Sequence, residues 1–383
     1  MKNIAVVTGT RAEYGLLKNI MIAIDEDKEL NLQLIVTGMH LSEKYGLSVR
    51  DIIKDGFKID EEIPILVDTI EKNKNALEMG KAVTAFAKTF QRLKPDILLV
   101  LGDRYEVFAA ASTAMLMGIA IAHIAGGEVT EGAMDDQIRH AITKMAHIHF
   151  PGAQIYADNI KRMGEESFRI HNVGDSGIEN IKLTTLMSKE ELSESLNMNV
   201  DENTLLITYH PVTLEYDDIE RQIDNLIIAL DKVNKKMIIT YPNSDNGSDK
   251  IIVALEKFAS NNTNVHLYKN LGSLRYLSAM NICEAVIGNS SSALIEAPFL
   301  KKPVVNIGNR QRGRLMADNV IQCGYDVDEI FDAINKAISY EFKDKVKNVK
   351  SLYGEGNTSE EIVKILKNTN IDDKLLMKKL SWD

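Results

Sequence analysis

Residues 97–124 read ILLVLGDRYEVFAAASTAMLMGIAIAHI, and they determine the architecture expected of the whole chain. The runs at 97–101 and 119–124 are continuously apolar, which is typical of parallel strands buried on both faces. Between them, residues 107–117 have the length and composition of a helix. A strand, a helix and a second strand in this order predict a βαβ unit, in which helices cover a parallel sheet.

The same alternation runs through both halves of the chain. Besides the unit above, we expect strands at 4–7, 32–36, around 168–173, 204–208, 236–240, 264–268, 285–287 and 303–307. Helices are expected at 14–24, 151–163, 293–300 and 358–374. Two successive series of βαβ units predict two doubly wound parallel sheets.

The length of the chain also predicts two domains. A chain of 383 residues exceeds the roughly 250–300 residues at which one hydrophobic core tends to divide. We expect an α/β fold with two Rossmann-like domains and a ligand cleft between them. The predicted boundaries are 1–175 for the first domain, 176–203 for the crossover, 204–357 for the second domain, and 358–383 for C-terminal helices that pack back on the first.

Composition excludes several classes of function. A net charge of −10 argues against nonspecific binding to nucleic acid, which needs a basic surface. The two cysteines form no disulfide framework, and no apolar run approaches the roughly 18 residues of a membrane span. The N-terminus, MKNIAVVTGTRAEYG, has the pattern of a first strand and not of a signal peptide. We therefore expect a cytoplasmic protein that contacts neither nucleic acid nor membrane.

Motifs for common cofactors are missing from the sequence. The glycines after the first strand do not follow the GxGxxG spacing, and there is no Walker sequence, so a nicotinamide or P-loop enzyme is disfavoured. The eight histidines show no HExxH spacing, so a zinc site is not expected. We predict no cofactor and no metal.

An acid-rich segment follows the strand at 119–124. Residues 123–140 read HIAGGEVTEGAMDDQIRH, and a helix is expected to begin near Met134. On that helix Asp135 and Arg139 share a face, as do Asp136 and His140, because each pair is four residues apart. The turn between strand and helix is where α/β folds usually bind ligands. An ordinary loop with an acidic helix start would have the same residues.

Other carboxylates lie at strand ends near this segment. Glu128 and Glu131 belong to the loop, and Asp103 follows the strand at 97–101. Asp103 would either cap the next helix or point into the cleft. Histidines inside apolar runs, such as His123, are expected to pack in the core.

A second polar turn predicts a phosphate site in the second half. Residues 288–292, GNSSS, stand between a strand and a helix, so Ser290 and Ser291 would present hydroxyls and free N–H groups to an anion. Glu296 lies about one and a half turns into the helix and is placed to accept hydrogen bonds from a ribose diol. The alternative is a serine N-cap without a ligand.

Cations near other strand ends strengthen this prediction. Residues 309–314, NRQRGR, place Arg310 and two more arginines after the strand at 303–307. Arg11 follows the first strand, and His210 ends the strand at 204–208, where it would contact phosphate or transfer a proton. Each of these residues would also suit an ordinary surface turn.

Six ordered segments resemble the UDP-N-acetylglucosamine 2-epimerase family, most closely its hydrolysing branch. They are GTRAEYG at 9–15, GDRYE at 102–106, HIAGGE with DDQIRHAITK within 123–144, HPVT at 210–213, GNSSS with Glu296, and GNRQRGR at 308–314. The resemblance implies the GT-B architecture, with two Rossmann-like domains and the active site between them. It also implies homodimers or homotetramers and no cofactor.

The reaction implied by the resemblance inverts C2 of the sugar and releases the nucleoside diphosphate. It proceeds by elimination to a 2-acetamidoglucal, followed by addition of water. The leaving diphosphate needs cations and dipoles, which the resemblance assigns to Arg11, His210, Ser290, Ser291 and Arg310. Proton transfer is assigned to Asp103, Glu128 or Asp135, with Arg139 orienting the acids and Glu296 holding the ribose.

The first expected substrate is UDP-N-acetylglucosamine, hydrolysed to N-acetylmannosamine and UDP for sialic acid biosynthesis. One alternative is the same reaction on UDP- or GDP-linked N,N'-diacetylbacillosamine, on the way to legionaminic acid. Ala125 bears on this choice, because several relatives carry an acid at its position. An alternative from another class is a GT-B glycosyltransferase, which would need an acceptor.

Overall fold

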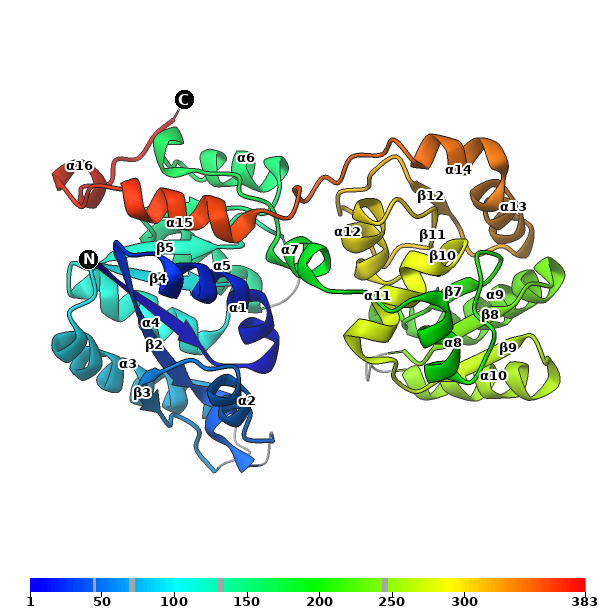
Figure 1. The fold of residues 1–383 in the computed structure, drawn as a ribbon, viewed down its shortest axis with the longest axis horizontal. Helices are drawn as coiled ribbons and strands as arrows, with labels where there is room; N and C mark the ends of the chain where they lie inside the picture. Colours follow the sequence, from blue (N-terminus) through cyan, green and yellow to red (C-terminus); the bar gives the residue numbers. More distant parts are fainter. Residues whose placement is uncertain (44–45, 69–72, 130–133, 243–246, 383) are drawn as a thin grey trace. The chain divides into compact units, whose positions relative to one another are not determined.

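The computed structural model describes residues 1–43, 46–68, 73–129, 134–242 and 247–382 (Figure 1). The chain forms two compact units. The first comprises Met1–Asn180 together with Tyr353–Asp383, and the second comprises Ile181–Leu352.

The first unit contains a six-stranded parallel sheet with the order β3-β2-β1-β4-β5-β6. Its strands are β1 (Lys2–Thr8), β2 (Leu30–Thr37), β3 (Ile59–Ile63), β4 (Ile97–Leu101), β5 (Ala120–Ile124) and β6 (Ile148–Phe150). The helices between them are α1 (Arg11–Glu26), α2 (Val49–Lys54), α3 (Lys74–Leu93), α4 (Tyr105–Leu116), α5 (Met134–Met145) and α6 (Gln154–Arg162). The order of strands reverses between β1 and β4, which is where such sheets bind ligands.

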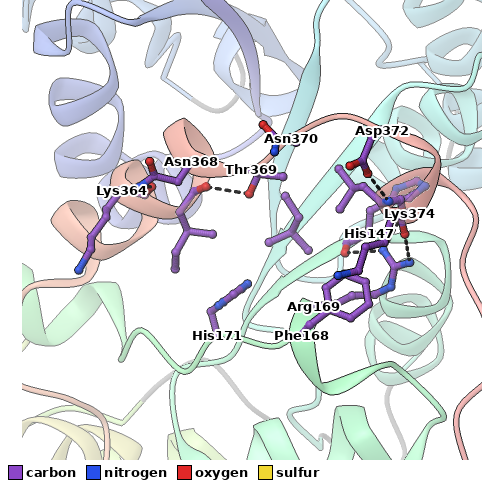
Figure 2. A pocket seen from close by; sticks show the side chains of 13 residues that line it. His147, Phe168, Arg169, His171, Lys364, Asn368, Thr369, Asn370, Asp372 and Lys374 are labelled. Atoms are coloured by element: carbon purple, nitrogen blue, oxygen red, sulfur yellow. Dashed lines mark hydrogen bonds between the residues drawn. The ribbon is translucent and has the colours of Figure 1, made fainter.

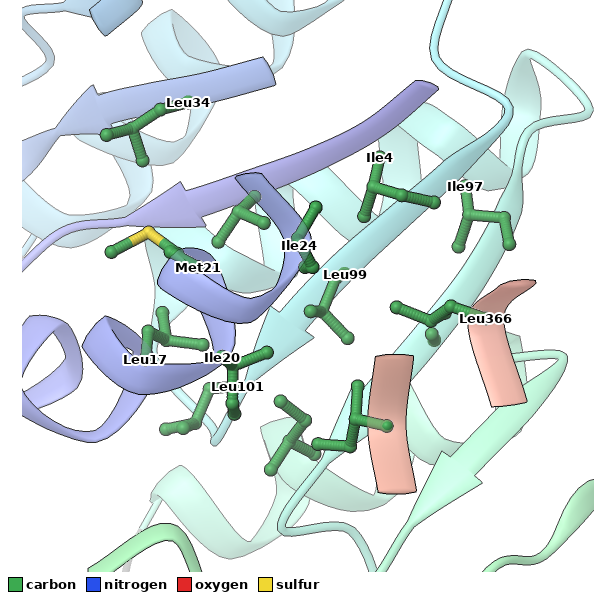
Figure 3. Close-up of a cluster of buried hydrophobic side chains, with 14 of the residues drawn as sticks. Ile4, Leu17, Ile20, Met21, Ile24, Leu34, Ile97, Leu99, Leu101 and Leu366 are labelled. Carbon is green, nitrogen blue, oxygen red and sulfur yellow. The ribbon is translucent and has the colours of Figure 1, made fainter. Parts of the chain in front are cut away.

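Alternate side chains of the first sheet enter two separate cores. Ile4 and Val6 of β1 point to the face covered by α1, whereas Ala5 and Val7 point to the face covered by α3, α4 and α5. Both faces are therefore buried, which explains why the strands are continuously apolar. Figure 3 shows the first of these cores, in which Leu366 belongs to the same cluster as side chains of α1 and of the sheet.

The C-terminal segment belongs structurally to the first unit. Helix α15 (Thr358–Asn368) packs beside α1, and the short helix α16 (Asp373–Leu376) follows it. Leu366 is fully buried in the core. Lys2 Nζ donates hydrogen bonds to the carbonyl oxygens of Leu366 (2.7 Å), Lys367 (3.0 Å) and Thr369 (2.7 Å), and so neutralises the carbonyl end of α15.

The second unit repeats the plan of the first. Its sheet has the order β12-β11-β10-β7-β8-β9, formed by β7 (Leu205–Thr208), β8 (Met237–Thr240), β9 (Val265–Tyr268), β10 (Ala285–Gly288), β11 (Val304–Ile307) and β12 (Val320–Cys323). The main helices are α8 (Lys189–Leu196), α9 (Ile219–Val233), α10 (Ser248–Asn261), α11 (Gly272–Ile282), α12 (Ser291–Phe299), α13 (Val327–Ile338) and α14 (Tyr340–Val346). The helix α7 (Ser176–Leu183) precedes them. The order reverses between β7 and β10, so the two units share one topology. The prediction of two Rossmann-like parallel sheets is confirmed.

The strand predicted around 168–173 is wrong. Ser167–Arg169 form a 3₁₀ turn, and only an isolated bridge joins Ile170 to His149. In this turn Arg169 is buried, and its guanidinium donates to the carbonyl oxygens of Leu375 (2.6 Å) and Lys374 (3.0 Å). Strands β3, β6 and β12 were not predicted. Within the described residues, no helix has the length and apolarity needed to cross a membrane.

Candidate active site

Asp103 and Arg139 form an ion pair at the carboxyl end of the first sheet. Asp103 follows β4, and Arg139 comes from the second turn of α5; their side chains are 22% and 7% exposed. Arg139 Nη1 also donates to the carbonyl oxygen of Glu128 (3.1 Å) and lies 3.6 Å from Asp136. The residue at the N-cap of α4 is Arg104, so Asp103 is not a helix cap. Its carboxylate is directed instead towards the acid-rich segment.

The surroundings of Asp103 disfavour its charged form. Burial raises the pKa of Asp103, Arg139 opposes that rise, and the negative charge of Asp135 adds to it; the pKa remains above its ordinary value. A carboxyl group whose pKa is raised and which lies at a ligand-binding strand end is suited to proton transfer.

The acid-rich segment is partly as predicted. His140 Nε2 lies 3.4 Å from Asp136, as the spacing of four residues predicted, whereas Arg139 reaches Asp103. His123 is fully buried as expected, and burial lowers its pKa to about 3, so it is neutral. Glu131 lies outside the described residues.

Backbone geometry holds the loop after β5 close to its neighbours. Gly127 has a φ of +79°, and a Cβ at this position would come within 2.3 Å of the carbonyl oxygen of Tyr156. Ala125 has a φ of +62°, which is uncommon for a residue with a side chain. The main-chain N–H of Ala125 donates to the carbonyl oxygen of Phe150 (3.1 Å). These contacts constrain the backbone of Ala125 and Gly127, just before Glu128.

Two buried carboxylates beside the strand ends were not predicted from the sequence. Glu13 accepts hydrogen bonds from the N–H groups of Gly9 (2.8 Å) and Thr10 (3.1 Å), and Glu106 accepts one from Arg104 Nε (2.5 Å). Burial and the nearby charge of Glu106 raise the pKa of Glu13 to about 8. The capping-box pattern from Thr10 to Glu13 was the signal that would have placed Glu13 at this turn.

Arg11 lies in an exposed position at the start of α1. Its guanidinium pairs with Asp51 of α2 at 3.0 Å, and both side chains are more than half exposed. Thr10, and not Arg11, caps the helix. The arginine is therefore accessible to an anionic ligand, since an exposed ion pair of this kind is weak.

A hollow of about 240 Å³ opens beside the acid-rich segment. Asp135, Arg104, Met39, Leu66 and Tyr105 are among the residues that line it. Asp135 therefore has two neighbours. Its charge raises the pKa of Asp103, and its side chain also lines the hollow.

A larger hollow of about 380 Å³ lies elsewhere in the first unit (Figure 2). His147, Phe168, His171 and Asn368 are among the residues that line it, so it lies at the amino end of β6 and beside the end of α15. It contains none of the predicted site residues. Ligands of open α/β sheets bind at the carboxyl ends of the strands, so this hollow is not the candidate active site.

In the second unit, Asn289 joins three of the predicted elements. It is fully buried and follows β10. Its side chain accepts from the N–H of His210 (2.7 Å) and donates to the carbonyl oxygen of His210 (2.8 Å). Its main-chain carbonyl accepts from Arg310 (3.1 Å) and Gln311 (2.7 Å). One asparagine therefore brings His210, the serine turn and the arginine-rich loop together.

Gly288 permits this arrangement. It has a φ of +135°, and a Cβ there would lie 2.0 Å from the carbonyl oxygen of Thr208. Only glycine lets β7 and β10 approach so closely at their carboxyl ends.

The start of α12 has the features of an anion site. Ser290 is the N-cap residue, and its side chain makes no capping hydrogen bond. The N–H groups of a first helical turn have no partner within the helix, so Ser291 and its neighbours can donate to an anion. Ser292 Oγ donates to Glu296, one turn further along, which orients that carboxylate towards the helix start.

Glu215 is a further residue that was not predicted from the sequence. It accepts hydrogen bonds from Tyr325 (2.6 Å), Asn309 (3.0 Å) and Gln222 (2.8 Å). It therefore links the segment after His210 to the arginine-rich loop. Among the described residues, no group of three or more histidine, cysteine or acidic side chains is arranged to hold a metal ion.

The chain is similar to known proteins in sequence and in fold. Residues 22–367 match the family model described as UDP-N-acetylglucosamine 2-epimerase. The chain is 42% identical to GDP/UDP-N,N'-diacetylbacillosamine 2-epimerase (hydrolyzing) of Campylobacter jejuni over 97% of both chains. It is 33% identical to UDP-N,N'-diacetylbacillosamine 2-epimerase (hydrolyzing) of Legionella pneumophila over 99% of both chains.

Solved structures give the same fold. The UDP-GlcNAc 2-epimerase of Neisseria meningitidis, solved with UDP-GlcNAc bound, superposes with a TM-score of 0.76 at 21% identity, and the match covers 96% of this chain and 100% of that one. At this identity the likeness supports the GT-B-like architecture alone. Because the family model spans most of the sequence and the two named relatives match nearly all of it, the chain belongs to the hydrolysing branch of the UDP-N-acetylglucosamine 2-epimerase family.

Proposed function

We propose that the protein is a hydrolysing 2-epimerase of nucleotide-linked N,N'-diacetylbacillosamine. The reaction would yield the free sugar with inverted C2 and a nucleoside diphosphate. The observation that carries this proposal is the 42% identity, over 97% of both chains, to a protein that bears this activity in its name. The relative at 33% identity is named for the same sugar. These names favour the diacetylated substrate over the UDP-N-acetylglucosamine that the sequence motifs first suggested.

The chemistry of the first unit supports an elimination. The reaction breaks the C1–O bond to the diphosphate and the C2–H bond, which gives a 2-acetamidoglucal. No carbonyl lies beside C2, so its proton is poorly acidic and the C1–O bond must break first. Asp103 is the favoured base, because it is partly buried, its pKa is raised, and Arg139 fixes its position. Glu128 and Asp135 lie on the neighbouring segment and are the candidates for delivering water.

The second unit supplies the groups that would stabilise the leaving diphosphate. Negative charge develops on the phosphate oxygen as C1–O breaks, and fixed donors stabilise it best. Ser290 and Ser291 at the start of α12, with Arg310 beside Asn289, form such a set. His210 is held by the same asparagine and would bind phosphate or protonate the leaving oxygen. Glu296 would accept hydrogen bonds from the ribose, and Arg11 of the first unit would add an exposed cation.

Water then adds across the double bond of the glucal. Its hydroxyl joins C1 and a proton joins C2 on the face opposite to the one it left. The product is the free sugar, so each turnover releases one nucleoside diphosphate.

Product analysis with three donors tests the proposal. UDP- and GDP-linked N,N'-diacetylbacillosamine and UDP-N-acetylglucosamine are each incubated with the protein, and nucleotides and sugars are separated by chromatography. We expect a diacetamido donor to give free nucleoside diphosphate and a sugar with inverted C2. A nucleotide-linked epimer without free diphosphate, or turnover only when an acceptor is added, would contradict the proposal. The latter result would favour a GT-B glycosyltransferase.

A further inference from the structure

The hollow beside the acid-rich segment has a lining that the proposed reaction does not explain. The reacting atoms of the sugar are C1 and C2, and Asp103 with Arg139 serves them. The hollow encloses about 240 Å³ and is lined by Arg104, which follows Asp103 in the sequence, and by Asp135, whose charge acts on Asp103. In a pyranose ring, C4 lies across the ring from C1. When C1 and C2 face Asp103, a substituent at C4 is therefore directed away from the diphosphate.

The apolar part of the lining would accommodate a methyl group. Met39 follows β2, Leu66 follows β3, and Met134 begins α5. Met39 and Leu66 are partly buried. Three apolar side chains from separate segments thus line one hollow next to charged residues, and a methyl group would pack against them.

The polar part of the lining is complementary to an amide. The hydroxyl of Tyr105 donates to the buried carboxylate of Glu78 (2.5 Å), and Glu78 also accepts from the N–H of Val67 (3.0 Å). Because its proton is committed to Glu78, the oxygen of Tyr105 is left to accept a hydrogen bond from a ligand. Asn75 and Lys74 also line the hollow and carry donors for a carbonyl oxygen.

We propose that this hollow binds the acetamido group at C4 of the diacetylated sugar, with Tyr105 accepting from its N–H and Leu66 packing against its methyl group. The inference rests on the proposed function and names the part of the chain that selects the sugar. UDP-N-acetylglucosamine carries a hydroxyl at C4 and would leave the hollow unfilled. Tyr105 and Leu66 are therefore assigned to substrate specificity and not to the chemical step.

Two variants test the assignment. Tyr105→Phe removes the accepting oxygen, and Leu66→Trp fills the hollow. For the diacetamido donor we expect kcat/KM to fall about tenfold in the first variant, as for one lost hydrogen bond, and more than tenfold in the second. For UDP-N-acetylglucosamine, measured as a substrate or as a competing ligand, we expect changes below about threefold in both. The inhibition constant of free UDP should not change. Tyr340→Phe, at an 81% exposed position, is the matched control.

The outcomes separate this inference from the proposed function. Equal losses with both sugars, or no loss with the diacetamido donor, would overturn the inference while the proposed function stands. If the unsubstituted protein turns over no donor, the proposed function fails and the inference falls with it. Thermal unfolding of each variant shows whether a loss of activity arises from misfolding. If Leu66→Trp misfolds, Leu66→Ala replaces it. This substitution enlarges the hollow and should weaken binding of the diacetamido donor but not of UDP-N-acetylglucosamine.

Discussion

Replacing Arg139 by Gln should move the acidic limb of the pH profile to higher pH. Arg139 does most to hold the pKa of Asp103 down against burial and against Asp135, and Arg104 adds a smaller effect. Asp103 must be deprotonated to act as a base, so activity rises as pH passes its pKa. Without the arginine that pKa rises, and the active form is reached only at higher pH.

The size of the shift follows from the position of the pair. Two unit charges about 4 Å apart interact by roughly 4 kcal/mol at an effective dielectric constant of 20. The Asp103 side chain is 22% exposed, so solvent screening reduces this to about 2 kcal/mol. Since one pKa unit corresponds to about 1.4 kcal/mol, the acidic limb should move by about 1.5 pH units.

The assay is kcat/KM for the diacetamido donor between pH 5 and 9, with released nucleoside diphosphate as the signal. Arg139→Lys keeps the charge and should shift the limb less. Arg162→Gln removes an arginine at the end of α6 and serves as the control. An Arg139→Gln protein that is folded, by circular dichroism, and whose acidic limb coincides with that of the unsubstituted protein would refute this role of the ion pair.

Three further predictions concern the phosphate site, the core and a buried carboxyl. Asn289→Ala removes the side-chain hydrogen bonds to His210 and should raise the inhibition constant of UDP about tenfold. An unchanged constant would show that Asn289 does not position the phosphate-binding groups. Leu366→Ala should lower the free energy of unfolding of the first unit by about 2–5 kcal/mol, measured by urea denaturation, because Leu366 is fully buried against the sheet. Leu183→Ala, at an exposed position, is the control. Equal effects of the two substitutions would contradict the packing of α15. The pKa of Glu13 is raised to about 8 in the folded protein. The unfolded chain releases this proton above about pH 4.5, whereas the folded protein keeps it until about pH 8. Stability is therefore lost as pH rises from about 4.5 to about 8. Glu13→Gln should therefore gain stability relative to the unsubstituted protein from pH 5 to 8, and a constant difference would argue against a neutral Glu13.

The fold was largely predictable because its strands are buried on both faces. Strands such as β4 and β5 are short, continuous apolar runs, and this pattern can be read from the sequence without knowing which side chains pack together. Strand β3 reads IDEEI and forms an edge of the sheet, so most of its side chains are not in the core and it gives no apolar signal. The strand predicted around 168–173 was wrong for a different reason. Arg169 is buried, and its charge is satisfied by carbonyl groups about 200 residues away, which a local sequence pattern does not reveal.

The site was predictable in its residue types and not in its pairings. The strand ends carrying Asp103 and the serine turn follow from topology, because carboxyl ends of parallel strands meet at one edge. That Arg139 reaches Asp103, and not Asp135 on its own helix, depends on how α5 is rotated, which spacing alone does not fix. Asn289 belongs to the GNSSS motif, which was singled out for its serines. Only its hydrogen bonds show that it connects His210 with the arginine-rich loop.

Isotope incorporation is the most direct test of the proposed elimination and hydration. The diacetamido donor is converted in D₂O, and the free sugar is examined by mass spectrometry and proton NMR. We expect a C2-inverted sugar in which solvent deuterium has replaced the hydrogen at C2, together with one equivalent of free nucleoside diphosphate. A product that retains its original C2 hydrogen, or that remains linked to the nucleotide, would contradict the proposed elimination and hydration.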